Sequence, residues 1–183
     1  MSDIDTNLNN TEEQPATKNV RLKYQKSIDG NHLLQSLQSG FISHNHGFYN
    51  HLAPSLLVNN HLQGKKILSA LTEELDTCDA FDFSVAFIND TGLASIMQKL
   101  EYLAKHNIKG RILTTNYLNF TTPGSLSKLL EFPNIELRVY TKGGFHPKGY
   151  IFKQSNYYSM IIGSANLTAS ALSQNQEWSI KFL

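Results

Sequence analysis

The sequence of 183 residues contains a single cysteine, Cys78. One cysteine excludes an intramolecular disulfide framework and a zinc site built from several thiolates, and it is typical of proteins from a reducing cytoplasm. For this lone cysteine, in the run LDTCDAF, we expect a small core side chain rather than a nucleophile. The predicted localisation is cytoplasmic.

Long apolar runs are also lacking. No stretch approaches the roughly 18 apolar residues that span a bilayer, and the N-terminal residues lack the basic start and apolar core of a signal peptide. Charged residues make up 17% of the chain and hydrophobic residues 40%, which is typical of a compact globular domain. We therefore expect a soluble, intracellular protein with no membrane partner.

The sequence has no internal repeat, and its length suits one domain. Residues 1–20 are polar and poor in apolar side chains, which predicts a disordered tail because too little apolar surface is available to offset the loss of chain entropy. The predicted domain covers residues 21–183. Since the last residues still follow a strand pattern, we expect this domain to be a fragment of a longer protein.

Helix and strand patterns alternate along the chain. Helical spacing of apolar residues predicts helices over residues 31–40, 65–78, 91–107 and 123–132, with Thr91 as a candidate N-cap. Strand patterns cover residues 81–88, 109–118, 135–141, 146–153, 157–164 and 177–183, and a short helix pattern covers residues 167–174. The predicted fold class is α/β, with a mixed central β-sheet flanked by helices that is parallel first and antiparallel, with a hairpin, in its C-terminal third.

A histidine and a lysine stand two positions apart in the apolar run GGFHPKGYIF, residues 143–152. Side chains at positions i and i+2 of a strand share one face, so His146 and Lys148 are predicted to point the same way. A lysine has little reason to face a protein core unless an anion meets it.

A second polar group follows at the end of the next strand pattern, in IIGSANLTASAL. Gly163 is expected to permit a tight turn, and Ser164 and Asn166 lie just before a predicted helix whose free N–H groups would attract an anion. In the last strand pattern, NQEWSIKF, Glu177 alternates with an aromatic face that contains Trp178 and is expected to face the core.

Together these residues supply an imidazole, an ammonium, an amide, a hydroxyl and a carboxylate. That set suits a phosphodiester, because a neutral imidazole can attack phosphorus while the lysine and the amide hold the non-bridging oxygens. A carboxylate can fix the imidazole tautomer. None of these roles requires a metal or another cofactor.

The motifs HPK, at His146 and Lys148, and GSAN, at Gly163, Ser164 and Asn166, resemble the HxK and GSxN signature of the phospholipase D superfamily. Their context over roughly residues 55–182 is similar to the phospholipase D-like nuclease domain at the N-terminus of certain bacterial DEAD/DEAH-type helicases. The resemblance implies a phospholipase D-like fold, helicase domains C-terminal to this one, and nucleic acid as the partner. Glu177 after GSxN also resembles the glutamate of metal-independent restriction endonucleases in the superfamily.

The resemblance implies a two-step reaction in which His146 forms a phosphohistidine and a second histidine protonates the leaving oxygen before activating water. The chain has only one HxK motif, so a homodimer with its site at the two-fold axis is implied. One position departs from the signature, because Lys153 stands where the superfamily carries an acidic residue. Glu177 is then the expected substitute.

Other polar residues are weaker candidates for the site. Thr115, Asn116 and Tyr117 follow a strand pattern at the end where α/β sheets bind ligands, which makes them candidate substrate-binding residues. His44, His46, His51 and His61 form a histidine-rich stretch, but without a thiolate or nearby carboxylate we expect no metal site there.

The sequence thus favours a metal-independent phosphodiesterase that acts on nucleic acid, DNA in particular. His146, Lys148, Asn166, Glu177 and Ser164 are the candidate catalytic residues, and Gly163 is a candidate substrate-binding residue. Two alternatives stay open: a non-catalytic module that binds nucleic acid or dimerises within a helicase, which Lys153 motivates, and a phospholipid hydrolase.

Overall fold

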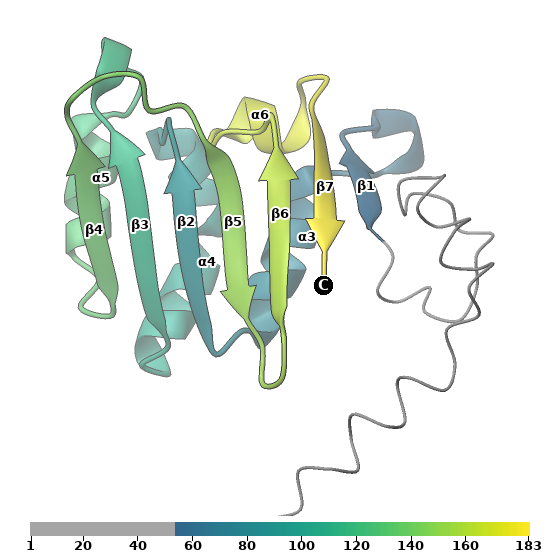
Figure 1. Cartoon of the computed structure of the whole chain (residues 1–183), viewed down its shortest axis with the longest axis horizontal. Coiled ribbons are helices and arrows are strands. Elements are labelled where there is room, and N and C mark those ends of the chain that lie inside the picture. The colour runs from purple at the N-terminus through teal and green to yellow at the C-terminus, as the bar shows by residue number, and fades with distance from the viewer. Residues whose placement is uncertain (1–53) are drawn as a thin grey trace, which may run out of the picture.

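The computed structural model describes residues 54–183, with the side chain of His61 left aside. Seven strands form one mixed sheet in the order β1-β7-β6-β5-β2-β3-β4 (Figure 1). The strands are β1 (Ser55–Val58), β2 (Ala80–Val85), β3 (Lys109–Thr115), β4 (Ile135–Tyr140), β5 (Lys148–Lys153), β6 (Tyr158–Gly163) and β7 (Trp178–Phe182). The helices are α3 (Ile67–Thr77), α4 (Asp90–Lys105), α5 (Pro123–Leu130) and α6 (Ala169–Ser173), with 3₁₀ turns η1 (His61–Gln63) and η2 (Tyr117–Asn119).

The sheet is parallel in one half and antiparallel in the other, as predicted. Strand β2 pairs in parallel with β3, and β3 with β4. Strands β5, β6, β7 and β1 are antiparallel to their neighbours, and β5 and β6 form the predicted hairpin. The predicted fold class is therefore confirmed, although β1 was not predicted and the helix expected over residues 31–40 lies outside the described residues.

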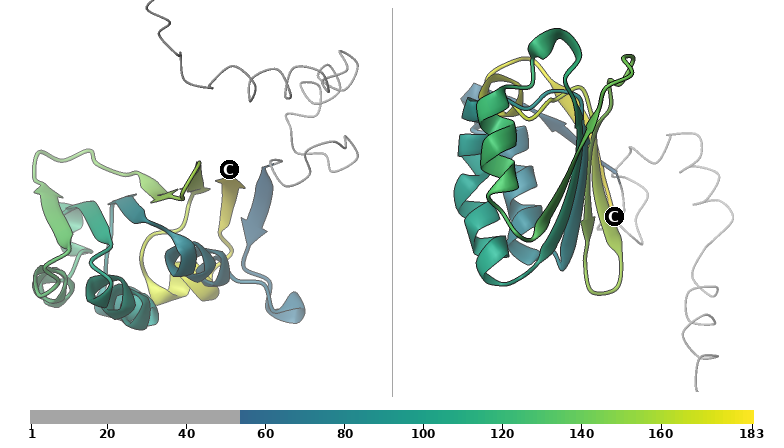
Figure 2. Two further views of the ribbon diagram at one scale, coloured as in Figure 1. Left: turned by 90° about the horizontal axis from the view of Figure 1, so that it is seen from below. Right: turned by 90° about the vertical axis from the view of Figure 1, so that its left-hand side faces the viewer.

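The four described helices all cover one face of the sheet, and no described helix covers the other, here called the open face (Figure 2). The core between helices and sheet contains four fully buried aromatic side chains, Phe81, Phe83, Tyr150 and Phe152. The ring of Phe83 packs edge-on against those of Tyr150 and Phe152, with centroid distances of 5.0 and 5.8 Å. These contacts fix β5 against β2, and β5 begins at the candidate lysine.

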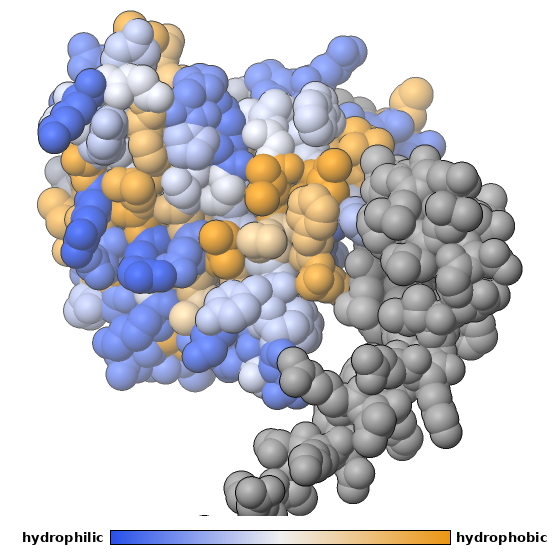
Figure 3. Space-filling model, viewed as in Figure 1, coloured by the Kyte–Doolittle hydropathy of each residue, from blue (hydrophilic) through white to orange (hydrophobic). Residues whose placement is uncertain are grey.

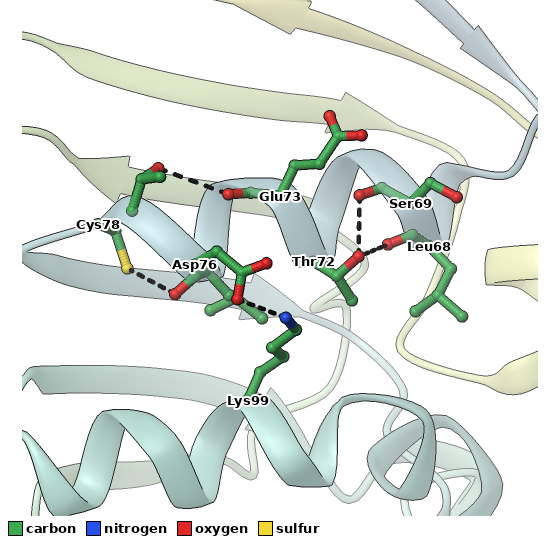
Figure 4. Close-up of polar contacts among 9 residues, drawn as sticks. Leu68, Ser69, Thr72, Glu73, Asp76, Cys78 and Lys99 are labelled. Atoms are coloured by element: carbon green, nitrogen blue, oxygen red, sulfur yellow. Dashed lines mark hydrogen bonds and ion pairs between the residues drawn. The ribbon is translucent and has the colours of Figure 1, made fainter.

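Cys78 lies at the end of helix α3, and Asn89 lies at the start of helix α4. Cys78 follows α3 as a buried residue, as predicted, and its thiol lies 3.9 Å from the carbonyl oxygen of Leu75 (Figure 4). The cap predicted for α4 was wrong, because Asn89 accepts the N–H of Gly92 while Thr91 only donates to Asn89. The helix begins at Asp90, and its cap lies two residues before the predicted one.

The prediction for the two faces of β7 was wrong. Trp178 is 58% exposed on the open face, whereas Ser179 is 1% exposed on the helix side. Lys181, also on the helix side, forms an ion pair of 2.5 Å with the buried Glu74 of α3. Alternation defines two faces of a strand, but it does not specify which of them meets the helices.

The open face consequently carries an apolar area over β6, β7 and β1 (Figure 3). Cross-strand pairing places Ile162 beside Ile180, and Ile180 beside Leu56. Leu56 and Ile162 are 61% and 48% exposed. This area begins directly beneath the strand ends that carry the candidate site.

Candidate active site

The candidate residues meet at one end of the central strands, at the top of Figure 1. Strand β5 is antiparallel to both β2 and β6, and β7 is antiparallel to β6. The ends of β2 and β6 therefore lie beside the starts of β5 and β7. This topology brings together His146 and Lys148, which precede or begin β5, Ser164 and Asn166, which follow β6, and Glu177, which precedes β7.

His146 and Lys148 are in contact, but not as two side chains on one strand. Strand β5 begins at Lys148, and His146 lies exposed in the preceding loop. The Lys148 ammonium lies 2.5 Å from Nδ1 and 3.1 Å from Nε2 of His146, and it donates to the His146 carbonyl oxygen at 3.0 Å. The ammonium of Lys148 therefore lies against the ring of the candidate nucleophile.

Lys148 is nearly buried, with 9% of its surface exposed. Burial lowers the pKa of its ammonium because desolvation disfavours the charged form, and the charge of Glu177 partly opposes this shift. Among residues 54–183, Lys148 has no carboxylate within ion-pair distance, whereas Lys99, Arg111, Arg138 and Lys181 each have one. Within this part of the chain, the Lys148 ammonium is therefore nearly buried without an ion-pair partner.

Phe87 connects the histidine to Asn166, a role that the sequence did not reveal. Its backbone N–H donates to Oδ1 of Asn166 at 3.3 Å, and its ring packs edge-on against His146 at 5.5 Å between centroids. With Oδ1 occupied, the Asn166 amide nitrogen is the end of the side chain left to donate to a ligand. The position of Phe87 just beyond β2, where α/β sheets bind ligands, is the signal that could have identified it.

Ser164 and Glu177 form a second polar pair. The Ser164 hydroxyl donates to Oε2 of Glu177, and Oγ also accepts the backbone N–H of Trp178 at 3.2 Å. Glu177 was expected to orient His146, but among the described residues its hydrogen-bond partner is Ser164 and the polar partner of His146 is Lys148. Glu177 nevertheless lies close enough for its charge to raise the pKa of the Lys148 ammonium.

Gly163 was predicted to permit a tight turn, but in the structure it permits the close approach of two strands. It ends β6, and it is not among the described glycines with a positive φ, which are Gly64, Gly143 and Gly144. A Cβ atom at Gly163 would lie 2.3 Å from both the Trp178 carbonyl oxygen and the Ser179 hydroxyl. The glycine thus allows β6 and β7 to approach closely enough for Ser164 to reach Glu177.

The predicted helix N-terminal anion site is not formed as expected. Helix α6 has five residues, and Thr168 rather than Asn166 caps it by accepting the N–H of Ala171 at 3.2 Å. Asn166 lies two residues earlier, in the chain segment beside β2.

Comparison with known proteins identifies the family. A sequence model described as the cardiolipin synthase, PLD-like domain matches residues 71–182, which is more than half of the chain. The chain belongs to the phospholipase D-like family. No curated protein sequence matches it.

Solved structures share the phospholipase D-like fold. NucT from Helicobacter pylori has a TM-score of 0.57 and 18% identity, and the match covers 70% of this chain and 83% of that one. Nuc of Salmonella typhimurium, a phospholipase D family member, has a TM-score of 0.53 and 22% identity over 70% and 82% of the two chains. Phosphatidylserine synthase of Haemophilus influenzae has a TM-score of 0.51 and 14% identity, over 70% of this chain and 34% of that one.

Lys153 is the position at which this chain departs from the phospholipase D signature. It is the last residue of β5, exposed, and paired with Ala80 and Tyr158. Lys148 begins the same strand, so the two lysines are separated by its full length, roughly 16 Å. Lys153 therefore has no part in the geometry of the site, and Glu177 does not occupy the place of the missing acidic residue.

The other candidate residues of this phospholipase D-like domain lie at the end of β3 and in the loop that follows it. The buried Thr115 hydroxyl donates to the Tyr140 carbonyl oxygen at 2.7 Å and accepts the N–H of Tyr117 at 3.1 Å, so it holds the strand ends together. Asn116 and Tyr117 are exposed beyond it. Their binding of substrate stays a prediction.

The described part of the chain shows neither a cluster of metal ligands nor a membrane-spanning helix. No three His, Cys, Asp or Glu side chains of residues 54–183 are grouped as metal ligands. His44, His46 and His51 lie outside the described residues, as does the side chain of His61. None of the helices described is both long and apolar enough to span a membrane.

Proposed function

We propose that this phospholipase D-like domain is a metal-independent phosphodiesterase that cleaves nucleic acid, DNA in particular, through a phosphohistidine on His146. The observation that carries the proposal is the nearly buried ammonium of Lys148, which contacts the imidazole and has no carboxylate partner in the described residues. A buried charge without a partner is costly. A phosphodiester oxygen bound there would offset this cost.

The described residues supply the nucleophile and the phosphate-binding groups of the first step. Lys148 and the Asn166 amide nitrogen bind the non-bridging oxygens, and the neutral imidazole of His146 attacks phosphorus. The bond to the leaving oxygen breaks as the bond between nitrogen and phosphorus forms, and the leaving oxygen takes a proton from a second imidazole. Water then displaces His146 and returns that proton to the second imidazole.

The second imidazole is proposed to be His146 of another copy of this chain. The chain has a single HxK motif, and His146 is exposed at the edge of the sheet, where a two-fold axis could bring two copies together. Glu177 and Ser164 would then support the strand ends that line this shared site. The helicase domains that the sequence resemblance implies stay a prediction.

Nucleic acid is the favoured substrate because exposed aromatic side chains surround the site at the strand ends. Tyr117, Phe120 and Trp178 are between 45% and 58% exposed. Nucleic-acid channels combine a phosphate-binding cation with aromatic rings on which bases stack. The rings are dispersed between loops and a strand end rather than joined into a tunnel for acyl chains, which makes phospholipid the weaker candidate.

Cleavage of end-labelled single- and double-stranded DNA in EDTA tests the proposal. We expect the wild type to cleave and both His146→Ala and Lys148→Met to lose cleavage. The matched control His106→Ala, which removes an exposed imidazole at the far end of α4, should keep it. DNA binding without cleavage would favour the non-catalytic module, turnover of phosphatidylcholine vesicles alone would favour the lipid hydrolase, and a strict requirement for Mg²⁺ would reject the metal-free mechanism.

A further inference from the structure

The loop after β3 exposes three large apolar side chains in succession around η2. Tyr117 is 45% exposed, Leu118 60% and Phe120 56%. Isolated exposed apolar residues are common on protein surfaces, but a cluster of them beside a site indicates a binding surface. The bond-forming and bond-breaking steps proposed above use no residue of this loop, so its exposed side chains require an explanation in terms of substrate binding.

The backbone of the loop is held in an unfavourable conformation. Leu118 and Asn119 have φ values of 57° and 54°, in the left-handed region that side chains larger than glycine rarely adopt. For leucine in particular this conformation is unfavourable, and such residues cluster at ligand sites. The conformation turns apolar side chains outward instead of folding them onto the core.

Hydrogen bonds fix both ends of the loop to the strand ends of the site. At its start, Tyr117 N–H donates to the Thr115 hydroxyl at 3.1 Å. At its end, the 5% exposed Thr121 donates through its hydroxyl to the Ala86 carbonyl oxygen at 3.2 Å. The apolar side chains are therefore presented by an anchored loop, which is what a binding surface requires.

A continuous row of rings joins this loop to the candidate nucleophile. The ring of Phe120 contacts that of Phe87 at 4.9 Å between centroids, and Phe87 contacts the imidazole of His146 at 5.5 Å. The free face of Phe120 is thus one ring away from the group that attacks phosphorus. A flat ring stacked on Phe120 would therefore lie close to a phosphate bound at His146.

We propose that Phe120 and Tyr117 form a subsite that stacks an unpaired nucleobase next to the scissile phosphate. The inference rests on the proposed function, because it identifies the substrate group that neighbours the phosphate at His146. Every base offers a π face, so stacking tolerates all sequences, but a base within a duplex is already stacked on both sides. The subsite therefore selects single-stranded nucleic acid.

The first test compares two single-stranded oligonucleotides that differ only in their bases. One carries normal bases, and the other carries tetrahydrofuran abasic units in their place. We expect the wild type to have a kcat/KM roughly tenfold higher for the oligonucleotide with bases, which corresponds to one stacked base. Phe120→Ala should bring this ratio close to one, and Phe120→Trp should restore it.

A matched control separates stacking from general effects of losing an exposed ring. Tyr102→Ala removes a side chain that is 46% exposed on α4, where its ring lies against His106 instead of the site. We expect this variant to keep the ratio between the two oligonucleotides. If Phe120→Ala also kept the ratio, or if the wild type showed no preference for bases, the subsite would be rejected.

A second readout does not depend on cleavage. Single-stranded DNA containing 2-aminopurine is titrated with the His146→Ala protein, because stacking of this base quenches its fluorescence. We expect quenching that is lost when Phe120→Ala is added to His146→Ala and retained with Tyr102→Ala. Absence of any quenching overturns the subsite, whereas quenching without cleavage by the wild type would reject the proposed nuclease activity and leave base stacking established.

Discussion

The hydrogen bond from Ser164 to Glu177 joins the end of β6 to the start of β7, and a double-mutant cycle measures its contribution. A bond to a charged acceptor contributes about 1.5–3 kcal/mol when it is buried. Both residues are only half-buried, so we expect a coupling free energy of about 1–1.5 kcal/mol. The Ser164 bonds to the Trp178 backbone cancel because they are absent from both proteins that carry Ser164→Ala.

The assay is urea unfolding of the wild type, Ser164→Ala, Glu177→Ala and the double variant, with the free energy of unfolding extrapolated to water. The coupling energy is the amount by which the effect of the double variant falls short of the sum of the two single effects. A value below about 0.3 kcal/mol would mean that the two side chains act independently. The structural reading of Glu177 as the partner of Ser164 would then be refuted.

Three further predictions concern residues of the site and the core. Lys148→Met should leave thermal stability unchanged or higher, because burial of the ammonium without a carboxylate partner is unfavourable, while DNA cleavage is lost; a clear fall in Tm would contradict this. Gly163→Ala should reduce the free energy of unfolding by about 1–3 kcal/mol, because its Cβ would meet β7 at 2.3 Å, whereas Gly149→Ala, with no atom near its Cβ, should have little effect in the same urea titration. Burial raises the pKa of Cys78 from 9.0 to about 11, so the unfolded chain loses this proton first and the free energy of unfolding should fall between pH 9 and 11. Relative to Cys78→Ala, the wild type should lose about 2 kcal/mol from pH 8 to pH 10.5, and an identical pH dependence of the two proteins would refute the buried thiol.

The alternation of elements and the mixed sheet could be predicted because each depends on local patterns. Helical spacing and strand-like runs are properties of neighbouring residues, and the hairpin of β5 and β6 follows from the turn residues between them. Strand β1 could not be predicted in the same way. It consists of four residues, and its partner β7 lies more than a hundred positions later.

The orientation of β7 could not be read from its alternation. The alternation of Trp178 and Ser179 gives two faces, and the more apolar face was assigned to the core. In the structure the other face meets the helices, where Lys181 pairs with the buried carboxylate of Glu74 and Ser179 lies beside Gly163. The pattern of a single strand does not contain such contacts between residues far apart in sequence.

The site could be recognised in part because HxK and GSxN are short, specific spacings. They indicated the strands whose ends meet at the site, and the structure brings His146 and Lys148 into contact. The pairing of Ser164 with Glu177 and the role of Phe87 depend on how β2, β6 and β7 approach one another. Such contacts follow from strand order, which no local motif specifies.

The central claim is that the imidazole of His146 attacks a phosphodiester without a metal. Incubation of the protein with end-labelled DNA in EDTA, followed by a quench in base and mass spectrometry, tests it directly. The account predicts a phosphate adduct on His146 of the wild type and none on His146→Ala. Cleavage without an adduct at His146, or an adduct on another residue, would contradict the mechanism.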